Sequence, residues 1–139
     1  MDAPRRPGVH VLVLTPSSEP SQALTAELRH RAETHCARFT LLVPAGSGPA
    51  AEAEARRVAE QLRAAGLPVK ETVCCSDLVA AVHETWNPRV HDEILISTTA
   101  QGSARWMRNG LPRRVERLTG AIVRHVPAHE RLADWRLAA

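Results

Sequence analysis

The sequence predicts a three-layer α/β/α sandwich built on a five-stranded parallel sheet. Short apolar runs rich in β-branched residues alternate with stretches of helical periodicity, and the loops between them are mostly short. No linker divides the 139 residues into two domains. A strand followed by a helix and a second strand favours right-handed crossovers, which give a parallel sheet with helices on both faces.

The five predicted strands are short and mostly apolar. Continuous apolar runs are typical of strands that are buried on both faces of a parallel sheet. The third run is more polar than the others, which favours an edge position for it. The strands are expected at residues 9–14, 39–43, 69–75, 93–97 and 121–126.

Two predicted helices precede the third strand. The first is expected to begin after Ser18, whose hydroxyl is suited to an N-cap. Its apolar stripe repeats every four residues and consists of Leu24, Leu28, Ala32 and Cys36. The second helix, at 50–65, is made of strong helix formers, and Gly66 stands where a C-terminal cap belongs.

Two more helices are expected around the fourth strand. Ser76 can cap a helix that stops before Pro88. The last helix is expected at 111–118, with Gly120 as its stop. Its apolar face consists of Leu111, Val115 and Leu118.

The predicted domain occupies residues 9–126. Residues 1–8 are expected to form a flexible lead, and residues 127–139 a C-terminal extension. No apolar run approaches the length of roughly 18 residues that a membrane span needs, and the amino terminus lacks the features of a signal peptide. We therefore expect a cytoplasmic protein without a membrane partner.

Charge and cysteine usage exclude few functions. The net charge of +3 is too small to call for nucleic acid, and no nucleic-acid partner is predicted. Six arginines and one acidic residue lie in 100–124, so the rest of the chain is net acidic. The three cysteines have no CxxC spacing and the histidines are scattered, so no metal site is predicted.

The carboxyl-terminal third, from Asp92 onward, reads DEILISTTAQGSARWMRNGLPRRVERLTGAIVRHVP. This text resembles the fourth strand, glycine-rich loop, last helix and fifth strand of the universal stress protein family. The resemblance implies the sheet order 3-2-1-4-5 and a homodimer formed through the fifth strands. The candidate dimer residues are Ala121, Val123 and His125. For many members it also implies ATP bound across the first and fourth strands.

The loop that binds ATP in that family departs from its usual pattern here. The family motif is G-x2-G-x9-G-[ST]. In this chain the corresponding loop begins at Ser97, and Asn109 and Gly110 occupy the positions of the motif's final Gly-Ser pair. Pro16 stands where many members place an acidic residue. The binding motif is therefore degenerate. The candidate nucleotide- or anion-binding residues are Thr15, Val43, Ser97, Thr98, Gly102, Ser103, Arg105, Asn109 and Gly110.

A group of arginines follows the fourth strand and continues into the last helix. Arginine forks bind phosphate, and the amino end of a helix adds partial positive charge. The same arginines could instead form a solvated helix face, because helical spacing points them in different directions. The group consists of Arg105, Arg108, Arg113, Arg114 and Arg117.

Three functional hypotheses remain open at the level of sequence. The first is a non-catalytic homodimeric module of the universal stress type, which binds ATP, another adenine nucleotide or a different small anion and regulates a protein partner. The second is a hydrolase that acts on a nucleotide through the same loops, although no general base and no catalytic residue can be named. The third is a structural interaction protein without a ligand.

Overall fold

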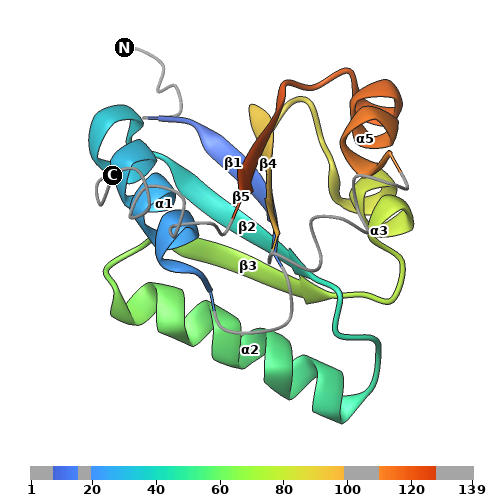
Figure 1. The fold of residues 1–139 in the computed structure, drawn as a ribbon, viewed down its shortest axis with the longest axis horizontal. Helices are drawn as coiled ribbons and strands as arrows, with labels where there is room; N and C mark the ends of the chain where they lie inside the picture. The colour runs from blue at the N-terminus through green and yellow to red at the C-terminus, as the bar shows by residue number, and fades with distance from the viewer. Residues whose placement is uncertain (1–7, 16–19, 99–109, 128–139) are drawn as a thin grey trace, which may run out of the picture.

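The computed structural model describes residues 8–15, 20–98 and 110–127, and it confirms the predicted fold class (Figure 1). The five strands form one sheet in the order β3-β2-β1-β4-β5, and every neighbouring pair is parallel. The elements are β1 (His10–Leu14), α1 (Gln22–His35), β2 (Arg38–Val43), α2 (Pro49–Ala64), β3 (Val69–Cys74), α3 (Leu78–Thr85), β4 (Glu93–Thr98), α5 (Leu111–Thr119) and β5 (Val123–Pro127).

Helices cover both faces of the sheet. Strand residues alternate between the faces, and the two buried clusters follow this alternation. Val11 and Val13 of β1 pack with α1 and α2, whereas Leu12 and Leu14 pack with α3 and α5. Figure 1 shows α1 and α2 on one side of the sheet and α3 and α5 on the other. The strands in the middle are therefore apolar on both sides, as the continuous apolar runs predict.

The chain leaves the sheet in opposite directions at the centre. β1 leads to α1 on one face, whereas its neighbour β4 leads towards α5 on the other face. In open α/β sheets, ligands bind beyond the carboxyl ends of the strands where the strand order reverses. The carboxyl ends of β1 and β4 are therefore the first place to look for a site.

Two of the predicted helix caps were wrong by a few residues. The N-cap of α1 is Ser21, whose Oγ accepts a hydrogen bond from the Leu24 amide at 3.0 Å, and Ser18 lies outside the described residues. The N-cap of α3 is Asp77 rather than Ser76, and its carboxylate accepts from the amides of Val79 and Ala80. A carboxylate is both a good acceptor and a favourable charge at a helix N-terminus.

Two residues predicted on apolar helix faces are exposed. Cys36 follows the end of α1 in the left-handed conformation, with φ 52°, and its amide donates to the Arg31 carbonyl. The helix ends one residue too early to bury it. Leu118 is 42% exposed because the last turn of α5 extends beyond the buried cluster that Leu111 and Val115 join.

Candidate functional site

Three of the predicted binding residues form a row at the carboxyl end of the sheet. Leu14 is in register with Leu42 of β2 and Ile96 of β4, so the next residue, Thr15, lies between Val43 and Ser97. All three side chains are buried, and the Thr15 amide donates to the Leu42 carbonyl at 3.1 Å. By the alternation of the strands, the row belongs to the face covered by α1 and α2.

A hollow of about 460 Å³ lies on the opposite face, where α3 and α5 begin. Both helices have their amino ends at the carboxyl end of the sheet, so their exposed amide dipoles point the same way. The hollow is lined by Pro44, Ser76, Asp77, Leu78, Val79, Leu111 and Arg114. The lining thus combines apolar side chains with a hydroxyl, a carboxylate and a guanidinium.

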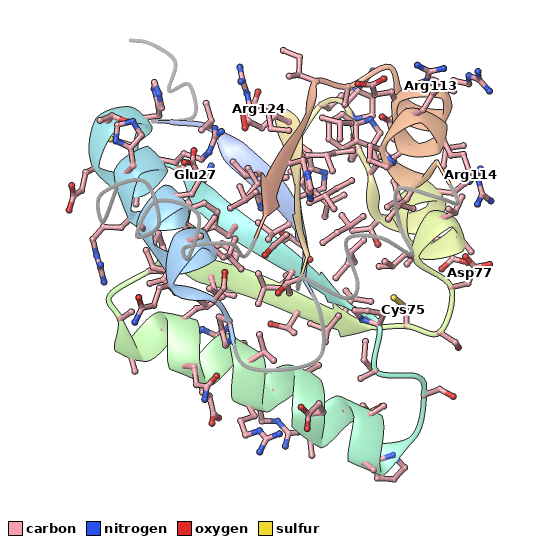
Figure 2. All side chains as sticks on the ribbon, in the orientation of Figure 1. Glu27, Cys75, Asp77, Arg113, Arg114 and Arg124 are labelled. Atoms are coloured by element: carbon pink, nitrogen blue, oxygen red, sulfur yellow. The ribbon has the colours of Figure 1, made fainter. Side chains whose placement is uncertain are left out.

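Three arginines of the predicted cluster, Arg113, Arg114 and Arg117, lie in the described part of the chain, and among these Arg114 lines the hollow. Within the described residues its guanidinium has no hydrogen-bond or ion-pair partner. Figure 2 shows Arg114 leaving α5 on the side of Asp77, whereas Arg113 projects from the helix in another direction. The expected divergence of the arginines on α5 is therefore visible in the structure.

Among the described residues, no side chain caps the amino end of α5. Its N-cap, Gly110, is in the left-handed conformation with φ 66° and offers no side chain to cap the helix. Pro112 has no amide hydrogen, so the first free donors of the helix are the amides of Leu111 and Arg113. In α3, by contrast, the Asp77 carboxylate already occupies the first amides. Of the two helix ends at the hollow, the α5 end is thus the one whose first amides no described side chain caps.

The remaining predicted binding residues divide into two groups. Thr98 is the last residue of β4 and is in register with Pro127. Four residues of the loop that follows β4 lie outside the described part of the chain, namely Gly102, Ser103, Arg105 and Asn109. The structure therefore brings Thr15, Val43 and Ser97 together, but it places Arg114 and the hollow on the other face of the sheet.

Sequence reasoning missed the contribution of the segment after β3. Ser76 was considered only as a helix cap and Asp77 was not considered, yet both line the hollow. Its position in the sequence could have indicated this role. The carboxyl ends of all parallel strands lie at the same edge of the sheet, and this segment directly follows the third predicted strand.

The candidate dimer residues lie at the border formed by β5. Ala121 precedes the strand, and Val123 and His125 are half-buried on the face covered by α5. Within the sheet of the described residues, β5 pairs only with β4. A second strand could therefore align with its outer edge, but the homodimer stays a prediction.

The cysteine after β3 is poorly suited to nucleophilic chemistry. Burial raises the pKa of the Cys75 thiol to about 11, and the neighbouring Cys74 and Asp77 add to the increase. Its Sγ donates to the Val43 carbonyl at 3.7 Å. Because the thiolate is the reactive form, Cys75 stays protonated and unreactive near neutral pH.

The described residues contain neither a metal-binding cluster nor a membrane-spanning helix. Among the described residues, no group of three or more His, Cys, Asp or Glu side chains is placed to hold a metal ion, and the prediction of no metal stays a prediction. In the same part of the chain, every helix is too short or too polar to cross a membrane.

The fold defines a three-layer α/β protein with a Rossmann-like sheet, open at the carboxyl ends of β1 and β4. No protein-family model matches the chain. A search of curated proteins also finds no significant match. The function therefore has to be argued from the geometry at the carboxyl end of the sheet.

Proposed function

We propose that the protein is a non-catalytic binding module of the universal stress type, acting in the cytoplasm. Its ligand carries phosphate, with ATP or another adenine nucleotide as the leading candidate. The observation that carries the proposal is the hollow at the open amino end of α5, which contains a guanidinium, Arg114, without a partner among the described residues.

The chemistry of the hollow favours an anion. An arginine fork can donate two hydrogen bonds to one phosphate, and the first amides of α5 add donors and partial positive charge. Asp77 opposes this preference, but two amides of α3 already occupy its carboxylate. A volume of about 460 Å³ lies within the range of about 300–1,000 Å³ that is common for ligand sites.

The regulatory part of the proposal involves a homodimer. Two copies would join through their β5 strands, around Val123, and the bound ligand would alter the affinity of the dimer for a protein partner. The position of β5 at a border of the sheet supports this arrangement, because an edge strand presents main-chain groups to another chain.

Ligand binding is tested by calorimetric titration of the full chain with ATP, ADP, AMP and inorganic phosphate. We expect ATP to bind, and Arg114→Gln to weaken binding by roughly tenfold, the loss of about one charge-assisted hydrogen bond. Arg117→Gln is the matched control, since Arg117 is also exposed on α5 but does not line the hollow. Equal effects of the two variants, or no binding of any ligand, would reject the site.

The same preparation separates binding from catalysis. Incubation of the chain with ATP and Mg²⁺ is expected to release no phosphate above the background of buffer. Steady phosphate release that Arg114→Gln reduces would contradict the binding module and support the hydrolase hypothesis. An intact protein that binds none of the four ligands and forms no dimer would favour a structural interaction protein.

The dimer is tested by sedimentation. We expect the wild-type chain to sediment as a dimer and Val123→Asp to sediment as a monomer, because the substitution places a charge at the proposed contact. Leu118→Asp is the control, since Leu118 is exposed on α5 rather than in β5. Circular dichroism verifies that both variants fold. A wild-type monomer, or a folded Val123→Asp dimer, would contradict the β5 contact.

A further inference from the structure

The opposite border of the sheet, formed by β3, leaves two residues with unpaired main-chain groups. Phe39 donates to the Pro68 carbonyl and Cys75 donates to the Val43 carbonyl, which fixes the groups that point towards β2. In a strand of a parallel sheet, the amide and carbonyl of one residue point to the same side, and those of the next residue point to the opposite side. Thr72 and Cys74 therefore point theirs away from β2, and no described residue bonds to these groups.

The start of β3 is closed by the chain itself. The Val69 amide donates to the Leu67 carbonyl at 3.0 Å, and the Arg63 guanidinium donates twice to the Val69 carbonyl, at 3.0 and 3.1 Å. Only the second half of the strand is therefore open. Two residues with an amide and a carbonyl each can make four main-chain hydrogen bonds with an added strand.

A groove of about 320 Å³ runs beside this open edge, between β3 and α2. Figure 1 shows α2 alongside β3 at the border of the sheet. The helix turns small residues, Ala55 and Ala59, towards the groove, and β3 contributes Thr72 and Cys74. The Thr72 hydroxyl oxygen is buried there without a hydrogen-bond partner. The groove thus combines space for side chains with an unused polar group.

The charges around the groove favour an acidic occupant. Three cationic residues line it, Arg56 and Arg63 from α2 and Lys70 from β3. Glu52 is the acidic residue on the α2 side. Glu71 of β3 also lines the groove, although it is in register with Thr40, whose hydroxyl contacts His10 on the face covered by α3. Three cationic residues against two acidic ones leave the lining net basic by one charge.

We infer that this border binds an extended, acidic segment of a partner protein as a sixth strand. The partner's main chain pairs with Thr72 and Cys74. Alternate side chains of the segment enter the groove beside Ala55 and Ala59, and its carboxylates lie near Arg56 and Lys70. A second copy of this chain is a poorer occupant, because pairing two β3 strands would bring both basic grooves together.

The inference is tested by fluorescence anisotropy with a short labelled peptide of alternating glutamate and valine, added to the full chain. The key control is the same peptide with N-methyl groups on alternate residues, which removes the strand-pairing amides but keeps every charge. We expect the unmodified peptide to bind and the N-methylated peptide to bind at least roughly tenfold more weakly. A lysine–valine peptide is expected not to bind.

Variants of two neighbouring arginines locate the site. Arg56→Glu, in the groove, is expected to weaken binding of the glutamate–valine peptide by roughly tenfold. Arg57→Glu is the matched control, since Arg57 is also exposed on α2 but pairs with Glu54 and does not line the groove. Thr72→Pro removes one outward amide from an edge position where proline is tolerated, and it is expected to abolish binding.

Three results would overturn the inference. Equal binding of the N-methylated peptide would show charge attraction without an added strand. Equal loss in Arg56→Glu and Arg57→Glu would place the contact outside the groove. A dimer of the free protein that Thr72→Pro dissociates and Val123→Asp leaves intact would assign the border to a second copy. If Thr72→Pro does not fold, the comparison of Arg56→Glu with Arg57→Glu and the binding of the N-methylated peptide still test the inference.

Discussion

At the amino end of the sheet, polar side chains from different elements bond to one another, whereas at the carboxyl end the arginine in the hollow has no partner among the described residues. Arg31 of α1 forms an ion pair with Glu93 of β4 at 2.5 Å and another with Glu27 at 3.0 Å. Arg114, at the other end, is exposed and unpaired within the described part of the chain.

A second set of contacts at the amino end lies on the face covered by α3. His10 Nε2 is 2.8 Å from the buried Thr40 hydroxyl, and the His10 and His91 rings meet edge to face at 4.8 Å. Trp86 stacks on His91, whose Nδ1 accepts from the Asn87 amide at 3.0 Å. These contacts join β1, β2 and the turn between α3 and β4.

We interpret the difference as a division of two tasks within one sheet. Contacts at the amino end hold the strands and helices in place, and the proposed ligand would bind at the carboxyl end. Binding residues are commonly found on loops that a rigid scaffold positions. If this division is correct, substitutions at the amino end should reduce stability, and substitutions in the hollow should reduce binding alone.

The largest loss of stability is expected from Arg31→Met. The substitution leaves Glu93, whose side chain is only 16% exposed, without its cationic partner. Removing one member of a mostly buried pair costs about 3 kcal/mol in the free energy of unfolding. Urea denaturation at pH 7 measures the loss.

The double variant Arg31→Met/Glu93→Leu is the control for this prediction. It removes both charges and should recover most of the lost stability, because an apolar pair of similar size avoids the desolvation of the ions. A single variant within about 1 kcal/mol of wild type would show that the ion pair does not hold the amino end.

A smaller loss is expected from Gly8→Ala, just before β1. A Cβ at this position would clash with the Cys36 carbonyl oxygen, which is backbone and cannot move as a flexible side chain would. The forced shift is expected to cost about 2 kcal/mol, the usual range for overpacking. Thermal unfolding of the variant measures this loss of stability. An unchanged midpoint would show that the backbone before β1 can shift without a loss of stability.

The fold was largely predictable from sequence because it depends on hydrophobic pattern. The alternation of Val11 with Leu12 does not specify a strand order, but the element order together with the family resemblance gave 3-2-1-4-5, which the structure confirms. Helix caps were less predictable. Ser76 and Asp77 are adjacent and both are good caps, so only the geometry of α3 shows which of them is used.

The contacts of the histidines were not predictable. His10, Thr40 and His91 are far apart in sequence, and their meeting depends on the register of three strands and the path of one turn. Alternation places His10 on the same face as Leu12, but it does not show what lies opposite. The arginines of α5 were predicted to diverge, and only the structure shows that Arg114 lines the hollow.

The third prediction concerns the pH dependence of the amino end. Burial lowers the pKa of His91 below 6.5, and the charges of Glu71 and Asp92 offset part of this effect. The unfolded chain then binds a proton at this histidine before the folded chain does. Stability should therefore fall as the pH drops below about 6.5, by at most about 1.4 kcal/mol per pH unit, until the folded histidine also protonates.

The variant His91→Asn tests the assignment. Asparagine keeps an acceptor for the Asn87 amide but cannot titrate, so its unfolding free energy should fall less between pH 7 and pH 5 than that of wild type. Urea denaturation at the two pH values gives the slopes. Parallel slopes would mean that another group causes the pH dependence.

The smallest change in stability is expected from Arg114→Gln, at the carboxyl end. Arg114 is exposed and unpaired among the described residues, so its loss should change the unfolding free energy by less than about 0.5 kcal/mol. Saturating ATP should then distinguish Arg114→Gln from wild type. A ligand that binds only the folded state raises the free energy of unfolding, and it does so more when it binds more tightly. We expect ATP to raise the urea midpoint of wild type and of Arg31→Met alike, and to raise that of Arg114→Gln much less. A loss of stability without ligand in Arg114→Gln as large as that in Arg31→Met would mean that both ends of the sheet serve the fold.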